Sequence, residues 1–204
     1  MVGPLGAEFF ARPARDVAPE LIGCLLAYGG VAGTIVEVER YEQWDAASHS
    51  FRGPRARART MFGPPGRLYV YRSYGVHWCV NVVCDAVGVG SAVLIRAVAP
   101  VSGVAMMESR RRTAVRRDLC RGPGRLTQAF DITGILDGAP LARDAASDGV
   151  VVTAPEQGPG PVVRSRRIGI SRDADRLWRY SLGGSPWVSG PRPTPAGEPV
   201  AAAA

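Results

Sequence analysis

Apolar and polar positions alternate most clearly in two neighbouring stretches of the chain, residues 67–73 and 76–84. Both stretches are rich in aromatic and β-branched residues, which favour strands, and only a short connection separates them. We therefore expect a β-hairpin that turns at Tyr74-Gly75. The residue before the glycine of such a turn often needs a positive φ, which suits Asn or Asp better than Tyr. Folding alone does not require a bulky aromatic residue at an exposed tip.

Hydrophobic periodicity predicts further helices and strands. A helix is expected over residues 14–27, where Asp16 can cap and the apolar residues share one stripe. Other helices are expected at 101–117, ending in five arginines, and at 125–130, after a break at 122–124. Strands are expected at 31–41, 92–98, 149–153, 164–170 and 177–182, and the polar stretch 45–60 is expected to be a loop with a helical turn. The Pro- and Ala-rich residues 191–204 are expected to be disordered, which leaves a domain over residues 1–190.

The charge of the chain gives the exposed tyrosine a second interpretation. Of 204 residues, 46% are hydrophobic and 21% are charged, a balance typical of one globular domain. The formal net charge of +7 indicates a polyanionic partner. In a basic protein, an aromatic residue on a protruding ribbon can pry stacked bases apart, whereas the simpler alternative is a ring that folds back over its neighbours. The hairpin alone leaves both interpretations open.

Residue usage also excludes some kinds of chemistry. All 25 basic residues are arginines, so no side-chain amine can form a Schiff base. The four cysteines (Cys24, Cys79, Cys84 and Cys120) are scattered and only two histidines accompany them, so we expect reduced core thiols and no metal site. The stretch before Cys24 is too polar for a signal peptide, and no apolar run near it can span a bilayer. The protein is therefore expected in the cytoplasm.

Two carboxylates on one expected strand are the first candidates for catalysis. Period-2 geometry places Ile35, Glu37, Glu39 and Tyr41 on one face of strand 31–41, with the carboxylates roughly 7 Å apart along it. Charged groups in an apolar strand are costly unless they are paired or used. One alternative is a half-exposed strand whose Glu residues pair with arginines. Another is a carbohydrate glycosidase that uses both carboxylates at a separation typical of inverting enzymes, although the basic charge and the lack of clustered aromatic residues weigh against it.

Arg96 interrupts the expected buried strand 92–98 and must find a carboxylate, with Glu39 or Glu37 as the natural partner. Such a pair is either structural, or it keeps a catalytic carboxylate ionised and helps to hold a water molecule. His49, in a polar loop, and His77, on the returning hairpin strand, are by themselves more typical of structural histidines. The arginine groups at 55–59, 110–117 and 164–167 together favour contact with phosphates.

Eight short motifs follow one another from about Phe9 to Val188. They are Ile35-Val-Glu-Val-Glu-Arg-Tyr41, Asp45-Ala-Ala-Ser-His-Ser50, Met61-Phe-Gly-Pro-Pro-Gly-Arg-Leu-Tyr-Val-Tyr71, Tyr74-Gly75 through Asn81, Leu94-Ile-Arg-Ala97, Gly122-Pro-Gly-Arg-Leu126, Arg167-Ile-Gly169 and Gly184-Ser-Pro-Trp-Val188. Each motif is weak alone. Together and in this order they resemble the alkyladenine (3-methyladenine) DNA glycosylase family, which comprises the mammalian-type alkylpurine glycosylases and their bacterial relatives.

The resemblance implies a fold and a set of residue roles. The fold is a compact single domain of the α/β class (α+β type), built on a curved antiparallel-rich sheet with flanking helices and a protruding β-hairpin. The family uses no metal or organic cofactor, so none is expected. The implied catalytic residues are Glu39, as the general base that activates a water for attack at the sugar C1′, with Arg96 and the backbone carbonyl of Ile168 as the other groups that hold this water. The implied base pocket consists of Tyr41, His49 and Tyr71, which sandwich the flipped base, and of Asn81, which guards against the amino group of normal guanine. Tyr74 is implied as the wedge, and Arg72 and Arg125 are expected among the DNA contacts.

The implied activity is that of a monofunctional DNA-repair N-glycosylase. Its partner is double-stranded DNA that contains damaged purines (3-methyladenine, 7-methylguanine, and with them hypoxanthine or ethenoadenine), and its product is an abasic site. A cationic alkylated base leaves readily, so one carboxylate suffices, and aromatic stacking favours such cations. We expect a monomer that does not interact with membranes. The alternative from another class is a nucleic-acid-binding protein that has this fold with little or no turnover.

Overall fold

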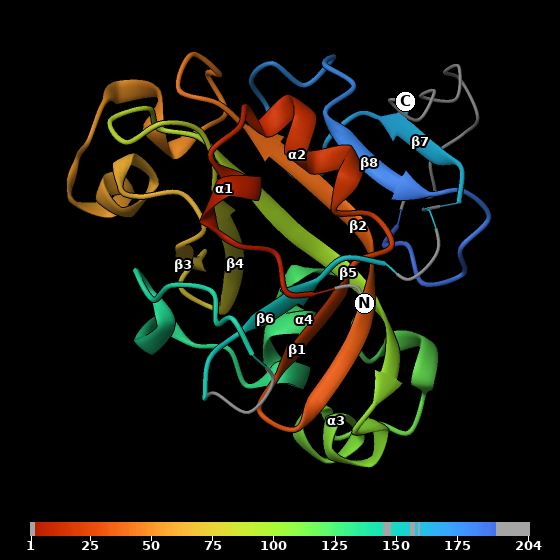
Figure 1. The fold of residues 1–204 in the computed structure, drawn as a ribbon. Coiled ribbons are helices and arrows are strands. Elements are labelled where there is room, and N and C mark those ends of the chain that lie inside the picture. The colour runs from red at the N-terminus through yellow and green to blue at the C-terminus, as the bar shows by residue number, and fades with distance from the viewer. Residues whose placement is uncertain (1–2, 145–147, 156–157, 159, 191–204) are drawn as a thin grey trace.

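The strands of this computed structural model form one antiparallel sheet, and helices cover one of its faces (Figure 1). The structure describes residues 3–144, 148–155, 158 and 160–190. The strands are β1 (Leu25–Tyr28), β2 (Val31–Tyr41), β3 (Leu68–Ser73), β4 (His77–Val83), β5 (Ala92–Ser102), β6 (Val151–Thr153), β7 (Val162–Ser165) and β8 (Arg179–Leu182). The α-helices are α1 (Ala7–Phe10), α2 (Ala14–Glu20), α3 (Val104–Arg111) and α4 (Pro123–Phe130), and the 3₁₀ turns are η1 (His49–Arg52), η2 (Ala56–Phe62), η3 (Arg116–Asp118) and η4 (Gly134–Leu136).

The sheet curls because β2, its central strand, changes partners along its length. The strand order is β3-β4-β5-β2-β1-β6, and β8 pairs with both β2 and β7. Residues 31–34 of β2 pair with β1, residues 37–39 pair with β8, and β5 runs along the other edge of β2. This curled antiparallel sheet with flanking helices confirms the expected α+β fold in a single compact domain.

The two faces of the sheet have different roles. Val38, Val80 and Ile95 belong to the main core, together with apolar side chains from all four α-helices. Their neighbours Asn81 and Arg96 face the other way and line a cavity. Because side chains alternate along each strand, the strands that build the core also place the polar residues opposite it. All four cysteines are buried free thiols, as expected.

The protruding hairpin is confirmed, with its turn where it was expected. β3 and β4 pair from Leu68↔Val82 to Ser73↔His77. Tyr74 and Gly75 both adopt positive φ, 49° and 69°. This sign pattern is that of a type I′ turn, which matches the right-handed twist of the strands. Tyr74 is 86% exposed, so its ring does not fold back over its neighbours.

Several sequence predictions were wrong in their boundaries or geometry. The expected helix 14–27 ends at Glu20, because Gly23 has a φ of 92° and the chain then enters β1. The expected helix 101–117 shrinks to α3, because β5 continues to Ser102 opposite Ala32. The expected strand 164–170 is shorter and earlier, at β7, and residues 167–170 leave the sheet. The strand predictions at 31–41, 149–153 and 177–182 and the short helix at 125–130 are confirmed within a few residues. The predicted tail 191–204 lies outside the described residues.

Ile35 does not share a face with Glu37, contrary to the expectation from strict alternation. The pairing of β2 with β5 shifts register between Ile35 and Glu37 and again between Glu37 and Val38. Ile35 and Val38 therefore both enter the main core, whereas Val36 packs in a separate cluster against Ala97. Such an irregularity inserts an extra residue and turns the following side chains to the other face.

Candidate active site

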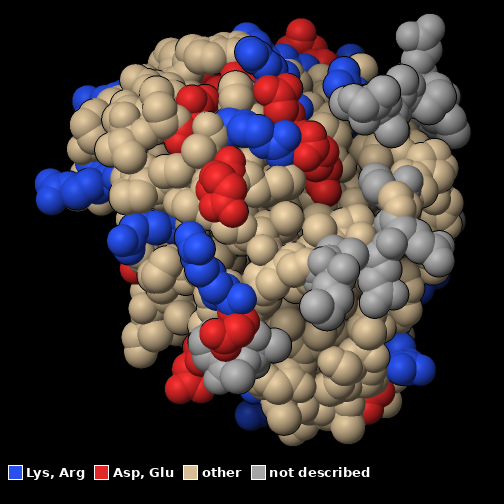
Figure 2. Space-filling model, in the orientation of Figure 1, with Lys and Arg blue, Asp and Glu red and all other residues tan. Residues whose placement is uncertain are grey.

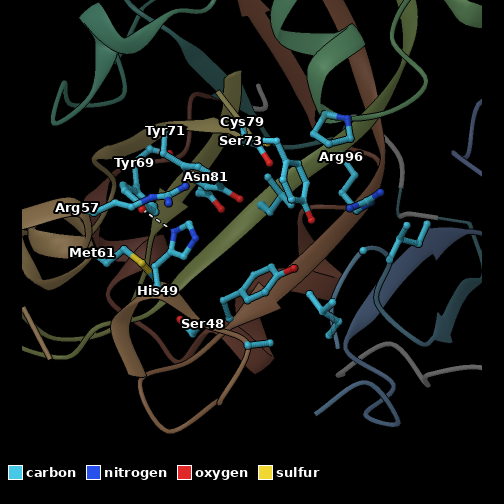
Figure 3. A pocket seen from close by; sticks show the side chains of 18 of the residues that line it. Ser48, His49, Arg57, Met61, Tyr69, Tyr71, Ser73, Cys79, Asn81 and Arg96 are labelled. Carbon is cyan, nitrogen blue, oxygen red and sulfur yellow. Dashed lines mark hydrogen bonds between the residues drawn. The ribbon is translucent and has the colours of Figure 1, made fainter. Parts of the chain in front are cut away.

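A cavity of about 580 Å³ opens on the face of the sheet opposite the helices, within the range of roughly 300–1,000 Å³ that is typical of ligand sites. Strands β2 to β5 supply one side of it, and residues 47–61 and 168–170 supply most of the rest, together with Tyr74 and Pro123. Figure 3 shows His49, Tyr69 and Tyr71 gathered on one side and Arg96 on the other. Seven of the expected site residues line this cavity: Tyr41, His49, Tyr71, Tyr74, Asn81, Arg96 and Ile168.

Glu39 lies directly behind the cavity wall. Its side chain is fully buried, and it accepts three hydrogen bonds. Oε2 accepts from the Tyr41 hydroxyl at 2.9 Å and from Arg96 Nη1 at 3.1 Å, and Oε1 accepts from the backbone N–H of Ile168 at 2.8 Å. All three donors line the cavity. Because each carboxylate oxygen has two lone pairs, the remaining acceptor position next to these donors is on Oε1, beside Ile168.

Arg96, on β5, binds both carboxylates of β2, which confirms the expected pairing with Glu39 or Glu37. Its Nε donates to Glu37 Oε1 at 3.0 Å, while Nη1 donates to Glu39. Desolvation alone would lower the pKa of Arg96, but Glu39 and Glu37 outweigh it and raise the pKa above its ordinary value. The guanidinium therefore remains charged at the cavity wall.

Glu37 belongs to the interior and does not line the cavity. Besides Arg96 it accepts from Arg179 Nε at 2.7 Å, from the Ser189 N–H at 2.6 Å and from the Ser189 hydroxyl at 2.9 Å. Desolvation raises the pKa of Glu37, but the charges of Arg96 and Arg179 outweigh this effect and lower it overall. A carboxylate enclosed in this way argues against a carbohydrate glycosidase that uses both Glu37 and Glu39.

Aromatic rings form the wall opposite Arg96. His49 and Tyr71 meet edge to face with their centroids 4.6 Å apart, and His49 Nδ1 is 2.8 Å from the Tyr69 hydroxyl oxygen. The His49 ring is open to the cavity, but desolvation on its other sides and the nearby charge of Arg57 lower its pKa to about 4. Burial raises the pKa of Tyr71, and it raises that of Tyr69 to about 12. At neutral pH this wall is therefore uncharged, apart from Arg57, and suited to stacking a planar ring.

Asn81 closes the end of this wall at β4. Its Nδ2 donates to the backbone carbonyl of Tyr69 at 2.9 Å, and its side chain is buried. The amide is therefore fixed by the neighbouring strand rather than free to rotate. A fixed polar group at the bottom of an aromatic slot can discriminate between planar ligands by their hydrogen-bonding edges.

The rim carries the expected wedge and several arginines. Tyr74 lies at the cavity mouth. Arg72 stacks on the Trp78 ring, with its guanidinium carbon 5.6 Å from the centroid, and Arg57 stacks on Tyr71 at 5.3 Å. Arg125 lies outside the cavity lining and pairs with Asp118 at 2.8 Å on the surface. By contrast, basic side chains lie among acidic ones on the face that carries α1 and α2 (Figure 2).

Sequence reasoning gave no pocket role to four residues at or behind this cavity. One of them, Arg167, was expected among the phosphate-contacting arginines, and that expectation was wrong because its side chain is buried. Tyr69 and Arg57 line it, whereas Asp45 and Arg167 form a fully buried ion pair behind it. Tyr69 could have been found, because it is two residues from Tyr71 on one strand and therefore on the same face. The ion pair gave no local signal, since 122 residues separate its partners.

The described residues contain no cluster of three or more His, Cys, Asp or Glu side chains that could hold a metal ion. No helix within the described ranges is both long and apolar enough to cross a membrane.

Comparison with known proteins places this arrangement in a family. Residues 8–186 match the family model described as Methylpurine-DNA glycosylase (MPG). A protein of Rhodopseudomonas palustris named "Putative 3-methyladenine DNA glycosylase" is 52% identical over 195 residues, which cover 94% of this chain and 91% of the relative. Proteins with the same name from Nitrobacter winogradskyi and Agrobacterium fabrum are each 50% identical; the alignments cover 92% and 89% of this chain and 88% and 90% of the relatives.

Proposed function

Because the chain belongs to the methylpurine-DNA glycosylase family, we propose that it excises damaged purines from double-stranded DNA by hydrolysing their N-glycosidic bond. The substrates we infer are 3-methyladenine and 7-methylguanine, with hypoxanthine or ethenoadenine as further lesions. The observation that carries this proposal is the position of Glu39. Its three hydrogen-bond donors, Tyr41, Arg96 and Ile168, are themselves lining residues of the cavity, whose volume of about 580 Å³ leaves room for a purine.

The first step of the proposed reaction is extrusion of the damaged nucleotide. The base would enter the cavity between Tyr41 on one side and His49 and Tyr71 on the other, while the exposed ring of Tyr74 fills the gap left in the duplex. Extrusion costs a few kcal/mol and is cheapest at damaged pairs, which supplies part of the selectivity. The arginines of the rim would contact phosphates, so affinity is expected to fall steeply as salt rises.

The second step is cleavage of the bond between the base and the sugar. A water bound at Glu39 Oε1 attacks the C1′ carbon as the purine leaves, and Glu39 takes the proton that this water loses. The carboxylate charge also stabilises the positive character that develops on the sugar. Arg96 and the backbone carbonyl of Ile168 are proposed as the other groups that hold this water. Neutral bases such as hypoxanthine additionally need a proton on the leaving purine, whereas cationic alkylpurines do not.

The test is a base-release assay on duplex oligonucleotides that carry 7-methylguanine, hypoxanthine or ethenoadenine at one position, followed by alkaline cleavage of abasic sites. The wild type should release at least one of these bases. Glu39→Gln should lower the single-turnover rate by about 10³-fold, the size expected for loss of a general base. Glu20→Gln is the matched control, because Glu20 lies on α2 in an exposed ion pair with Arg12. Binding of damaged duplex without release by either protein would instead support a binding module.

A further inference from the structure

A buried ion pair lies behind the cavity and contacts segments that line it. Arg167 donates to both carboxylate oxygens of Asp45, from Nη1 to Oδ2 and from Nη2 to Oδ1 at 2.9 Å, and both side chains are fully buried. Nη1 of Arg167 also donates to the backbone carbonyl of Arg40 at 3.2 Å. Neither member of the pair lines the cavity. The pair is therefore available to act only through its neighbours.

One neighbour is the ring proposed to stack on the extruded base. The guanidinium carbon of Arg167 lies 4.7 Å from the centroid of the Tyr41 ring and 5.0 Å from that of Trp178. Tyr41 lines the cavity and donates its hydroxyl hydrogen to Glu39. A planar cation stacked on the ring fixes the ring plane, and with it the direction of the hydroxyl.

The other neighbours are the two loops that complete the cavity. Asp45 Oδ1 accepts from the backbone N–H of Ala47 at 3.0 Å, which orients the segment that carries His49. On the other side, Arg167 immediately precedes Ile168, whose N–H donates to Glu39 Oε1. A single ion pair therefore connects the base-stacking ring, the His49 loop and the segment beside the open acceptor position of Glu39.

Stability alone is a weak reason for such a pair. Replacing a buried ion pair by apolar side chains of similar volume is often neutral or stabilising, because two charges have lost their hydration. We propose that the Asp45–Arg167 ion pair is a positioning device for base excision, which holds Tyr41, the segment 47–49 and Ile168 in register with Glu39. This inference rests on the proposed function and extends it to two residues that do not contact substrate.

The test separates the rate of base release from both binding and folding. Asp45→Asn keeps the shape of the side chain but removes its charge, and Arg167→Lys keeps the charge but loses the planar two-pronged contact. For both variants the single-turnover rate should fall by roughly ten- to a hundredfold, since misplacement by about 1 Å can cost that much. The dissociation constant for damaged duplex should change by less than about threefold, because phosphate contacts dominate it. Glu20→Gln should change neither quantity.

A second variant distinguishes positioning from mere stabilisation. In Asp45→Leu/Arg167→Met both charges are removed together, so the melting temperature should return toward that of the wild type. If the pair positions the site, this double variant remains at least about tenfold slow despite its restored stability, since lost alignment is not repaired by packing. A double variant that regains both stability and the wild-type rate would overturn the proposal.

A measurement of local backbone dynamics tests the positioning role without an activity assay. Amide hydrogen exchange of residues 166–170 and 46–49 should accelerate in Asp45→Asn, because Arg167, next to Ile168, loses its charged partner and the Ala47 N–H exchanges a carboxylate acceptor for a weaker amide oxygen. It should stay unchanged in Glu20→Gln. Unchanged exchange together with an unchanged rate of release would also overturn the proposal. If the wild type itself releases no base from any lesion, the proposed function fails and the positioning role fails with it. If the wild type is active and the variants are equally fast, only the positioning role fails.

Discussion

Glu37 and Glu39 lie two residues apart on β2, are both fully buried and both bind Arg96, yet they belong to two different regions of the molecule. The other partners of Glu37 are Arg179 and Ser189, which come from the C-terminal part of the domain and enclose it in the interior. The remaining donors to Glu39 are groups of the cavity wall. Burial and ion pairing therefore do not distinguish a structural carboxylate from a candidate catalyst. The surroundings of its donors do.

The largest effect on stability is expected on the interior side. Glu37→Gln leaves the buried Arg96 and Arg179 with one carboxylate fewer, so the free energy of unfolding should fall by about 3 kcal/mol. Urea denaturation at pH 7 measures this loss. Glu20→Gln, in an exposed pair, should lose less than about 1 kcal/mol. A loss for Glu37→Gln as small as that of the control would show that the interior cluster is not structural.

The acid dependence of this difference follows from the lowered pKa of Glu37. A group with a lowered pKa in the folded state contributes stability that is complete above its ordinary value of 4.5 and disappears as the pH falls through its folded value. The gap in unfolding free energy between the wild type and Glu37→Gln should therefore narrow as the pH is lowered below 4.5. Urea denaturation at pH 7 and near the acid limit of folding provides the comparison, and a gap that widens in acid contradicts the assignment.

On the cavity side, the next largest effect is expected from the hydroxyl that contacts Glu39. Desolvation and the charge of Glu39 raise the pKa of Tyr41, so its hydroxyl keeps the hydrogen that it donates. Tyr41→Phe retains the ring for stacking but removes a hydrogen bond to a charged group. We expect the single-turnover rate of release to fall by about tenfold, with duplex affinity unchanged. An unchanged rate would show that the hydroxyl does not contribute to catalysis and would leave Tyr41 with a stacking role alone.

Part of this arrangement follows from alternation in the sequence. Tyr71, Asn81 and Arg96 each follow an apolar residue of the core on their own strand, so their common face was predictable once the strands were. The turn position of Tyr74 was predictable as well, because Tyr74 and Gly75 connect two stretches that alternate like strands. The exposed ring and the positive φ values confirm that position.

The rest depends on contacts that no local pattern encodes. The irregular register in β2 removes Ile35 from the face that carries Glu37, and it arises from pairing with β5 rather than from the residues of β2 alone. Arg179 and Ser189 reach Glu37 across more than 140 residues, and Arg167 reaches Asp45 across 122. Tertiary pairing of this kind is decided by the whole fold.

Smaller effects are expected at the hairpin tip, where one substitution should raise stability and weaken the capture of damaged DNA. Asn tolerates the left-handed conformation of residue 74 better than Tyr does, so Tyr74→Asn should raise the free energy of unfolding by about 0.5 kcal/mol. The same change removes the proposed wedge and should weaken capture of damaged duplex several-fold, roughly the value of a base–aromatic stack. Tyr74→Phe keeps the ring and should retain capture. A Tyr74→Asn variant that binds normally would show that the tip is not a wedge.

The smallest effect is expected at His49. It distinguishes the cavity side from the Glu37 side by the pH range in which each loses stability. Its pKa of about 4 lies below the ordinary value of 6.5, so the unfolded chain binds the proton more readily and stability falls as the pH drops from 6.5 towards 4. Because the ring is open to the cavity, solvent screening limits this loss to about 0.3 kcal/mol. His49→Gln should abolish it, which denaturation between pH 7 and 4.5 can detect. The cavity side would then respond to acid above pH 4.5 and the Glu37 side below it, whereas an NMR titration midpoint of His49 near 6.5 would remove this distinction.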